Sequence, residues 1–494
     1  MSAEPLFPFS NTYTSLPPEF FSRQKPTPVP KPALITVNTQ LAAYLGVDAA
    51  RLQSGEGLAV LAGNQLAAGS DPIATAYAGH QFGGWNSQLG DGRAILLGEV
   101  MATDGQRYDI QLKGSGPTPY SRNGDGRSPL GPVLREYIVS EAMVALGVPT
   151  TRSLAAVTTG DSVVREGYLP GAILTQVAKS HIRVGTFQYF AARDEAAVRV
   201  LADYVIARHY PQAADKKNPY AAFLGAVVTR QAQLIAQWMS FGFIHGVINT
   251  DNMLVSGETV DYGPCAFMDE FSNLKVFSSI DRQGRYAYGN QPGIGQWNLA
   301  CLAQALLPLL AADENEQVAI AQAEVNAYGE IFRDAYNQRM AVKIGLANAS
   351  ASSESLIADL LKLMSDHQLD FTLTFRALTE ILRAEQGETP QWIEQLLVLP
   401  AEMDEWLQRW HAQRSQAHSL SESVQLMTAA NPVFIPRNHQ IEWAIREASR
   451  EQDFTRFHTL VEVLAQPFEF FPEHLEFARA PEAAERVRRT FCGT

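Results

Sequence analysis

The chain has 494 residues, of which 46% are hydrophobic and 18% charged, a composition typical of a folded globular protein. Its formal net charge of -13 disfavours general binding to nucleic acid or to anionic membranes. Three scattered cysteines are too few for a disulfide framework, which favours a reducing, cytoplasmic location. We find no apolar run of about 18 residues and no secretory signal at the start, so we expect no membrane partner and no export.

Residues 1–84 are rich in Pro, Gly and Asn, with one short helical stretch at 38–45, and we expect them to wrap over a neighbouring domain. Residues 93–113 predict a hairpin, because the apolar RAILLGEVM and the alternating RYDIQLK flank a polar ATDGQ turn. Lys113 ends the second strand of this hairpin. The segment LREYIVSEAMVAL then has apolar residues at helical spacing and stops at Gly147, which predicts a helix.

The pattern changes from strands to helices near the middle of the chain. A long amphipathic helix is expected over 221–241, and helical patterns dominate from about residue 193 and again beyond about residue 295. Strand-like pieces precede them at 151–158, 162–168 and 172–178. Strands first and helices later predict an α+β fold with two lobes.

The most specific motif is HGVINTDN, followed by DYG. These segments resemble the catalytic loop and the DFG motif of protein kinases, in which an Asn seven residues after the His and the DFG Asp bind magnesium. Here those positions are Asn252, seven residues after His245, and Asp261. An amide oxygen, a carboxylate and nucleotide phosphates form a ligand set that Mg²⁺ accepts. The alternative is that both side chains only cap turns.

Two upstream residues agree with the kinase pattern. Lys113 ends a strand and Glu136 opens the helix that follows 23 residues later, as do the paired lysine and glutamate of a kinase N-lobe. We therefore expect a structural ion pair between them, although a strand-end lysine is often only solvated. The expected divisions of this protein-kinase-like, two-lobed fold are a wrapping N-terminal extension (1–84), an N-lobe (85–190), a C-lobe (191–310) and a helical C-terminal region (311–494).

One departure from the kinase pattern concerns the reaction. A kinase places its catalytic Asp two residues after the His, and this chain has Val247 there. Because valine cannot accept a proton, phosphoryl transfer by the usual kinase arrangement is disfavoured. Asp251, beside Asn252, is the candidate that accepts a hydroxyl proton instead.

Two GDGR segments, at 90–93 and 124–127, lie on either side of Lys113 in the sequence. Glycine lets backbone N–H groups approach phosphates, and arginine offers a bidentate fork to phosphate oxygens. Two copies predict an anion cradle, although Asp-Gly is also common in turns. A further basic cluster is expected at an anion site, with a solvated surface as the alternative, and consists of Lys179, His181 and Arg183.

Nine segments spread over nearly the whole chain carry a further resemblance. They are FSNTYTSLPPEFF, YAGHQFGGWNSQLGDGRAILLGE, QLKGSGPTPYSRNGDGRS, REYIVSEAMVALGVPTTRSLA, SHIRVGTFQ, HGVINTDNM, DYGP, QGRYAYGNQP and NPVFIPRNH. Together they resemble the selenoprotein O family of kinase-like protein adenylyltransferases. The resemblance implies binding of ATP in a flipped orientation, with Mg²⁺ or Mn²⁺, and transfer of AMP to Ser, Thr or Tyr hydroxyls of proteins. Transfer of UMP from UTP is a related activity that it also implies.

The same resemblance implies roles for single residues. It makes Asp251 the proton acceptor and makes Asn252 and Asp261 the metal ligands. The family has a nucleotide-binding arginine where this chain has Gln176, and Lys179, in place of the usual proline, is a candidate to restore that charge. The implied nucleotide-binding positions are Gly90, Gly92, Arg93, Lys113, Asp125, Gly126, Gln176, Arg183 and Asp261.

Cys492 occupies the place near the C-terminus where family members carry selenocysteine or cysteine. The resemblance implies a redox role and a disulfide with a cysteine in the activation-loop region. The expected partner position is Phe277, which leaves Cys265 as a substitute candidate. A plain thiol in the tail is the alternative.

Two further functions stay open at this stage. One is a kinase that uses Asp251 as its base, and the other is an inactive, nucleotide-binding pseudokinase scaffold. Val247 and Gln176 favour the scaffold. Four retained residues favour an enzyme, namely Lys113, Glu136, Asn252 and Asp261.

Overall fold

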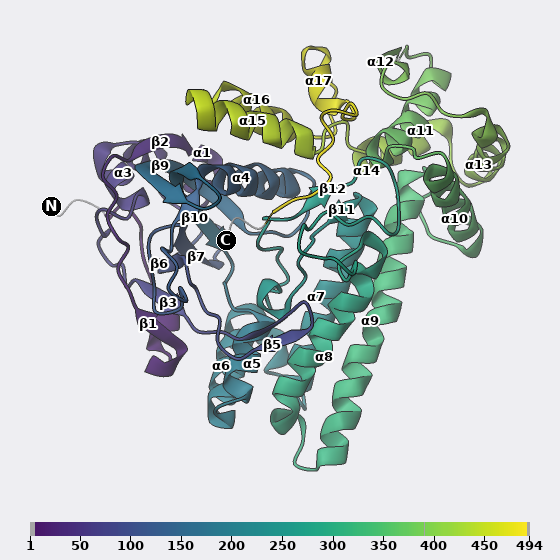
Figure 1. Cartoon of the computed structure of the whole chain (residues 1–494). Coiled ribbons are helices and arrows are strands. Elements are labelled where there is room, and N and C mark those ends of the chain that lie inside the picture. The colour runs from purple at the N-terminus through teal and green to yellow at the C-terminus, as the bar shows by residue number, and fades with distance from the viewer. Residues whose placement is uncertain (1–4, 390, 492–494) are drawn as a thin grey trace.

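An antiparallel sheet of eight strands forms the core of the N-terminal part of the protein (Figure 1). The computed structural model describes residues 5–389 and 391–491. The strand order is β1-β3-β6-β7-β10-β9-β2, and β8 pairs with β10. The strands are β1 (Phe21–Arg23), β2 (Ala33–Val37), β3 (Ile73–Thr75), β6 (Ala94–Met101), β7 (Arg107–Lys113), β8 (Ser128–Pro129), β9 (Arg152–Val164) and β10 (Tyr168–Ala178).

The predicted hairpin at 93–113 is confirmed as β6 and β7, which pair antiparallel. Alternate side chains of β7 point to opposite faces of the sheet. Ile110 and Leu112 belong to a buried hydrophobic core on one face. Gln111 and Lys113 line a cavity on the other face. The alternation of this strand therefore places the lysine in the cavity.

Residues 5–84 are built into the sheet as well as lying over it, since they supply β1, β2 and β3. The sequence pattern predicts one short helix here, but residues 5–84 of the structure contain three α-helices, because Asp48 and Ser54 each cap a further one. The three helices pack on the apolar face of the sheet. They are α1 (Thr39–Tyr44), α2 (Ala49–Leu52) and α3 (Gly55–Leu61).

The two strand-like pieces at 151–158 and 162–168 are not separate strands. β9 runs through most of the first piece and into the second as far as Val164, and β10 begins at the end of the second. The polar TTGDS segment has the composition of a turn. Gly160 within it has a φ of 76°, and the register between β9 and β10 shifts at this point. The segment is therefore a bulge, and the pairing of the two strands continues on both sides of it.

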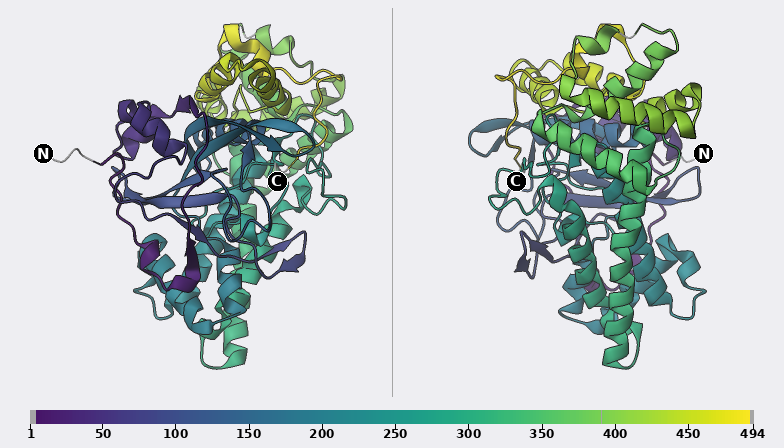
Figure 2. Two further views of the ribbon diagram at one scale, coloured as in Figure 1. Left: turned by 60° about the vertical axis from the view of Figure 1, so that its left-hand side comes forward. Right: turned by 90° about the vertical axis from the view of Figure 1, so that its right-hand side faces the viewer.

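The helices of the middle part confirm the predicted change from strands to helices. The amphipathic pattern at 221–241 forms α7, which starts at Pro219 because Asn218 caps it and proline suits the first helical position. Helix α7 packs with α8 and α9, and Figure 2 shows how far α9 extends beside them. These helices are α4 (Leu130–Ala145), α5 (Val184–Ala191), α6 (Glu195–His209), α7 (Pro219–Ser240), α8 (Gln291–Leu310) and α9 (Glu314–Lys343).

The C-terminal region is helical, as expected, and its last long helices return to the sheet. Arg135 of α4 donates to Asn438 at 2.8 Å and to Glu442 at 2.6 Å, both on α15. In Figure 1, α15 and α16 accordingly lie along α4. The helices are α10 (Ala351–Asp366), α11 (Phe371–Glu385), α12 (Gln391–Glu394), α13 (Asp404–Ala417), α14 (Leu420–Ala430), α15 (Asn438–Glu451), α16 (Thr455–Leu464) and α17 (Leu475–Ala478).

The structure confirms an α+β fold with an antiparallel sheet. The protein-kinase-like arrangement in two lobes, and the four divisions of the chain, stay predictions. Within the described residues, no helix combines the length and the apolar character needed to cross a membrane.

Candidate nucleotide-binding site

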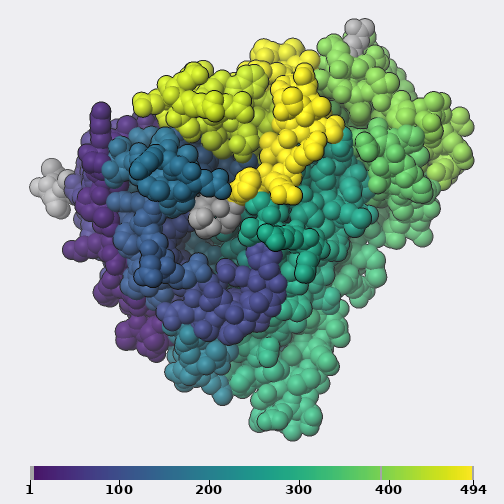
Figure 3. All heavy atoms as spheres, in the orientation of Figure 1, coloured from purple at the N-terminus to yellow at the C-terminus, as the bar shows by residue number. Residues whose placement is uncertain are grey.

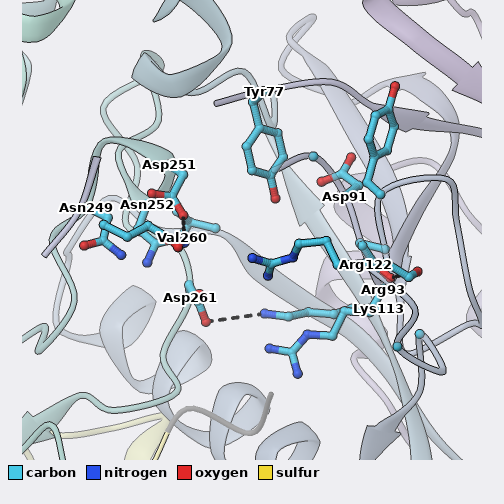
Figure 4. A pocket seen from close by; sticks show the side chains of 18 of the residues that line it. Tyr77, Asp91, Arg93, Lys113, Arg122, Asn249, Asp251, Asn252, Val260 and Asp261 are labelled. Carbon is cyan, nitrogen blue, oxygen red and sulfur yellow. Dashed lines mark hydrogen bonds and ion pairs between the residues drawn. The ribbon is translucent and has the colours of Figure 1, made fainter. Parts of the chain in front are cut away.

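A cavity of about 660 Å³ lies between the sheet and the segment that follows α7 (Figure 4). Its volume is in the range of pockets that bind cofactors and other small molecules. The residues predicted to bind nucleotide, metal or a proton all line it, although they come from distant parts of the sequence. They are Gly90, Gly92, Arg93, Lys113, Asp125, Gly126, Gln176, Arg183, Asp251, Asn252 and Asp261.

The expected ion pair is present at the inner wall of the cavity. Lys113 Nζ, at the end of β7, lies 2.8 Å and 2.6 Å from the two carboxylate oxygens of Glu136 on α4. The same ammonium lies 3.7 Å from Asp261 Oδ1. Two carboxylates therefore hold one lysine at a fixed place in the cavity.

Asp261 has an unusual backbone and a low pKa. Its φ of 69° is in the left-handed region, which non-glycine residues seldom occupy. Burial by itself would raise its pKa, but the charges of Lys113 and Arg93 outweigh that effect and lower the pKa to about 2. Asp261 is therefore ionised at neutral pH.

The loop between His245 and Asn252 is held by hydrogen bonds to its own neighbourhood. His245 Nε2 lies 2.9 Å from the carbonyl oxygen of Val260, just before Asp261. Asn252 Nδ2 donates to the carbonyl of Val247 at 3.0 Å. The hydrogen bond from Asn252 Nδ2 fixes the orientation of this amide, and its oxygen, Oδ1, can still bind a ligand.

Asp251 also lines the cavity, and its surroundings differ from those of Asp261. Burial raises its pKa to about 6, although a hydrogen bond from Gln81 and the charge of Arg183 lower the value in part. Gln81 Nε2 donates to Asp251 Oδ2 at 2.9 Å, and Arg183 donates to the backbone carbonyl of Asp251 at 2.5 Å.

The glycines of both GDGR segments are required by close packing. A Cβ on Gly90, whose φ is 90°, would lie 2.4 Å from the ring of Tyr120. A Cβ on Gly126, whose φ is 62°, would lie 2.1 Å from the carbonyl oxygen of Gly116. Both loops can approach the cavity only without side chains at these positions.

The aspartates of the two segments already have partners. Asp91 Oδ2 accepts from the backbone N–H of Thr75 at 3.0 Å and from its hydroxyl at 2.6 Å. Asp125 accepts from both terminal nitrogens of Arg165, at 2.9 Å and 3.0 Å. Asp125 therefore lines the cavity as a member of an ion pair.

The expected basic cluster at 179–183 does not form one anion site. Arg183 lines the cavity, with its guanidinium 4.6 Å from the ring centre of Tyr77. His181 is buried elsewhere, with Nδ1 3.1 Å from Asp109 Oδ2. Lys179 lines a different cavity, of about 480 Å³, together with Glu258. The prediction is wrong for the histidine and the lysine.

Gln176 lies beside the ion pair of Lys113 and Glu136. Lys179 lies in another cavity and therefore cannot supply the charge that an arginine at position 176 would carry. Gln176 Nε2 donates to Glu136 at 2.9 Å and to Thr151 at 3.1 Å. Strand β10 ends at Ala178, and Lys179, just after it, lines the separate cavity that contains Glu258. The proposed compensation by Lys179 is therefore wrong.

Sequence reasoning missed several residues of the cavity wall. Each comes from a loop or a strand end whose pattern carries no sign of a cavity, although the first two lie in the segment YAGHQFGGW. The missed residues are Tyr77, Gln81, Arg122 and Arg165.

The cavity suits a magnesium or manganese ion that also binds phosphate. Asn252 and Asp261 both line it and offer an amide oxygen and an ionised carboxylate. No group of three His, Cys, Asp or Glu side chains placed to hold a metal occurs in the described ranges 5–389 and 391–491. A metal here would need phosphate oxygens and water to complete its ligands, which is the usual environment of Mg²⁺.

The redox prediction concerns the end of the chain, and Cys492 lies outside the described residues. The segment before it crosses the face of the molecule (yellow in Figure 3). Thr490 N donates to the carbonyl of Phe277 at 2.8 Å, and its hydroxyl donates to Pro264 at 2.5 Å. Cys265 is buried, and burial raises the pKa of its thiol to about 12.

Comparisons with known proteins give one family. The family model described as "Protein adenylyltransferase SelO" matches residues 6–465. The protein named "Protein nucleotidyltransferase YdiU" of Methylorubrum populi is 54% identical to this chain over 495 residues, which cover 99% of both chains. The protein of the same name in Rhodopseudomonas palustris (strain BisB5) is 56% identical over 493 residues, again 99% of both chains. The protein of that name in Rhizobium rhizogenes is 55% identical over 495 residues, 99% of this chain and 97% of the relative. The family match includes every cavity residue named above.

Proposed function

Since this chain belongs to the SelO family of protein adenylyltransferases, we propose that it transfers AMP from ATP to hydroxyl groups of acceptor proteins and releases pyrophosphate. The single observation that carries the proposal is the composition of the cavity wall. The same cavity is lined by cations that can bind a polyphosphate, by a carboxylate that can accept a proton and by oxygen atoms that can bind a metal. The position of the kinase base is occupied by Val247, which also lines the cavity.

The phosphate-binding part of the proposal rests on Arg93, Lys113 and Arg183. Their charges would stabilise the pyrophosphate as it leaves, which is where negative charge increases during transfer. Glu136 holds Lys113 by two hydrogen bonds, so the ammonium is positioned before ATP binds. We therefore expect ATP to bind with its β- and γ-phosphates against these cations and its α-phosphate toward Asp251.

Asp251 is the proposed proton acceptor. The acceptor hydroxyl oxygen forms a bond to the α-phosphorus, the bond from that phosphorus to the bridging oxygen of pyrophosphate breaks, and the hydroxyl proton goes to the Asp251 carboxylate. Asn252 and Asp261 would hold Mg²⁺ or Mn²⁺, which when bound neutralises phosphate charge.

Finer details of the activity are part of the same proposal. Ser, Thr and Tyr are the protein hydroxyls that this chemistry fits, and UTP in place of ATP would give UMP transfer. A cytoplasmic location stays a prediction from the scattered cysteines. A kinase that uses Asp251, and an inactive scaffold, are the alternatives that the experiment must exclude.

The test uses ATP labelled on the α-phosphate or, separately, on the γ-phosphate. The purified protein is incubated with each label, a protein extract as acceptor, and Mg²⁺ or Mn²⁺. We expect protein-bound label only from α-labelled ATP, and a parallel reaction with α-labelled UTP measures UMP transfer. Transfer of the γ-label would support the kinase, and binding of ATP without transfer of either label would support the scaffold.

A further inference from the structure

A small hairpin of two strands, β4 (Gly79–Gln81) and β5 (Gly84–Asn86), lies against the loop that carries Asp251. It pairs with no strand of the eight-stranded sheet among the described residues. It comes from the segment GHQFGGW, for which neither the sequence pattern nor the proposed mechanism supplies a role. Its contacts with Asp251 suggest one.

Strand β4 contacts both oxygens of the Asp251 carboxylate. Gln81 Nε2 donates to Oδ2 at 2.9 Å. A Cβ placed on Gly79 would lie 2.6 Å from Oδ1, so only glycine permits this approach. Oδ1 has no hydrogen-bond partner in the described part of the chain. The Gln81 amide is thus the side-chain donor that fixes the rotation of the carboxylate.

The hairpin is held in place without the Gln81 side chain. His80 N donates to Thr250 Oγ1 at 2.7 Å. Phe82 N donates to Asn249 Oδ1 and to the Tyr286 hydroxyl, each at 3.2 Å. These backbone bonds tie the hairpin to Asn249 and Thr250, the two residues that precede Asp251. The hydrogen bond from Gln81 is therefore available to orient the carboxylate rather than to anchor the hairpin.

We propose that Gln81 is a positioning residue that holds the Asp251 carboxylate in the orientation needed to accept the proton of the acceptor hydroxyl. The inference rests on the proposed function and adds to it the role of the β4–β5 hairpin. A carboxylate that rotates freely spends less time aligned with the hydroxyl, and small misplacements of reacting groups cost large factors in rate. Gln81 therefore acts on the transfer step, through Asp251, and not on ATP binding.

The experiment compares Gln81→Met with wild type in the transfer of α-labelled AMP. Methionine keeps the length of the side chain but has no N–H to donate. We expect kcat to fall about 10-fold or more, as for the loss of a hydrogen bond to a charged group, with KM for ATP within about twofold. Gln81→Glu should lower kcat further, because a second carboxylate would face Asp251. Gln88→Met, at an exposed glutamine just after β5, is the matched control and should equal wild type.

The outcomes separate this inference from the proposed function. If wild type transfers no AMP, the proposed function fails before Gln81 is tested. If wild type is active and Gln81→Met keeps its kcat, the positioning role is overturned. The role is also overturned if Gln81→Met raises KM for ATP and lowers the melting temperature together, since loss of the hairpin would produce both.

Discussion

At the scale of single residues, Asp251 and Asp261 of the cavity differ in pKa because their neighbours differ. Asp261 is half-buried beside Lys113 and Arg93, whose charges lower its pKa to about 2. Asp251 is buried with fewer opposing charges, and its pKa rises to about 6. A permanently ionised group suits metal binding, and a group with a higher proton affinity suits proton transfer. The division of roles in the proposed mechanism follows this difference.

Gln176→Arg should tighten ATP binding. The side chain at this position lines the cavity beside Glu136, so an arginine there would add a cation close to the phosphates. A charge-assisted hydrogen bond stabilises by about 1.5–3 kcal/mol, and we therefore expect the Kd for ATP to fall at least about 10-fold. Titration calorimetry with ATP measures the change.

Two variants serve as controls for the Gln176→Arg measurement. Gln176→Met removes the amide without adding charge and should not tighten binding. Lys179→Ala should leave the Kd unchanged, because Lys179 lines the separate cavity that contains Glu258. A Kd for Gln176→Arg within about twofold of wild type, or weaker binding by Lys179→Ala, would contradict the placement of these side chains.

Asp261→Asn should remove most of the metal-dependent activity. It replaces the one carboxylate assigned to the metal with a neutral amide, which we expect to lower the rate of transfer roughly 100-fold or more. Chelation of divalent metal should abolish transfer by wild type, and added Mg²⁺ or Mn²⁺ should restore it. Asp359→Asn, at an exposed aspartate of the distant α10, is the control and should be fully active. Full activity of Asp261→Asn would show that the ligand assignment is wrong.

Residues inside recognisable motifs could be placed from the sequence, and residues outside them could not. The spacing from His245 predicted Asn252 and Asp261, which the fold brings to one cavity, while His245 itself is buried behind it against the carbonyl of Val260. Gln81 contacts Asp251 across 170 positions, and no local pattern encodes such a contact. The cluster that includes Lys179 failed because its members lie in the irregular segment between β10 and α5, where closeness in sequence does not bring side chains to one site.

At the scale of elements, the end of the chain is joined to the segment after β12 (Ala266–Phe267). Thr490 hydrogen-bonds to Phe277 and pairs with Ser278. Arg486 forms an ion pair with Glu270 at 2.6 Å. The position expected to carry the partner of Cys492 therefore lies beside the tail, but it holds a phenylalanine.

Phe277→Cys should form a disulfide with Cys492 under mild oxidation. Cys492 follows Thr490 by two residues, which span at most about 7 Å, and this reach is compatible with a disulfide. Wild type should form no bond to Cys265, since a buried thiol with a pKa of about 12 forms little thiolate. Mass spectrometry of peptides from oxidised protein identifies the pairs. A Cys265–Cys492 peptide from wild type would contradict this account.

Some elements were predictable because their signal is local. The β6–β7 hairpin follows from period-two alternation around a polar turn, and α7 follows from its apolar stripe and its Asn-Pro start. The bulge at Gly160 divided β9 in the prediction, because a bulge and a turn use the same residue types. Only the pairing of β9 with β10 on both sides of Gly160 distinguishes the bulge from a turn, and the sequence alone does not reveal that pairing.

At the scale of the whole molecule, distant parts of the chain meet around α4. Strand β2 from the N-terminal segment completes one edge of the sheet that α4 covers. Helices α15 and α16 pack on α4 from the other side (Figure 1). Since α4 carries Glu136, both ends of the chain support the helix that positions Lys113. The order of local patterns along the chain predicted strands before helices. It did not predict this convergence, which depends on contacts between residues hundreds of positions apart.

The most direct measurement of the central claim is the mass added to an acceptor protein. An acceptor labelled in the transfer assay is incubated with ATP and Mg²⁺ and either wild type or Asp251→Asn, and its intact mass is recorded. We predict that wild type adds the mass of one AMP group per modified hydroxyl, and that Asp251→Asn adds almost none while binding ATP as wild type does. Addition of a phosphate mass by wild type, or equal addition of AMP by Asp251→Asn, would contradict the account.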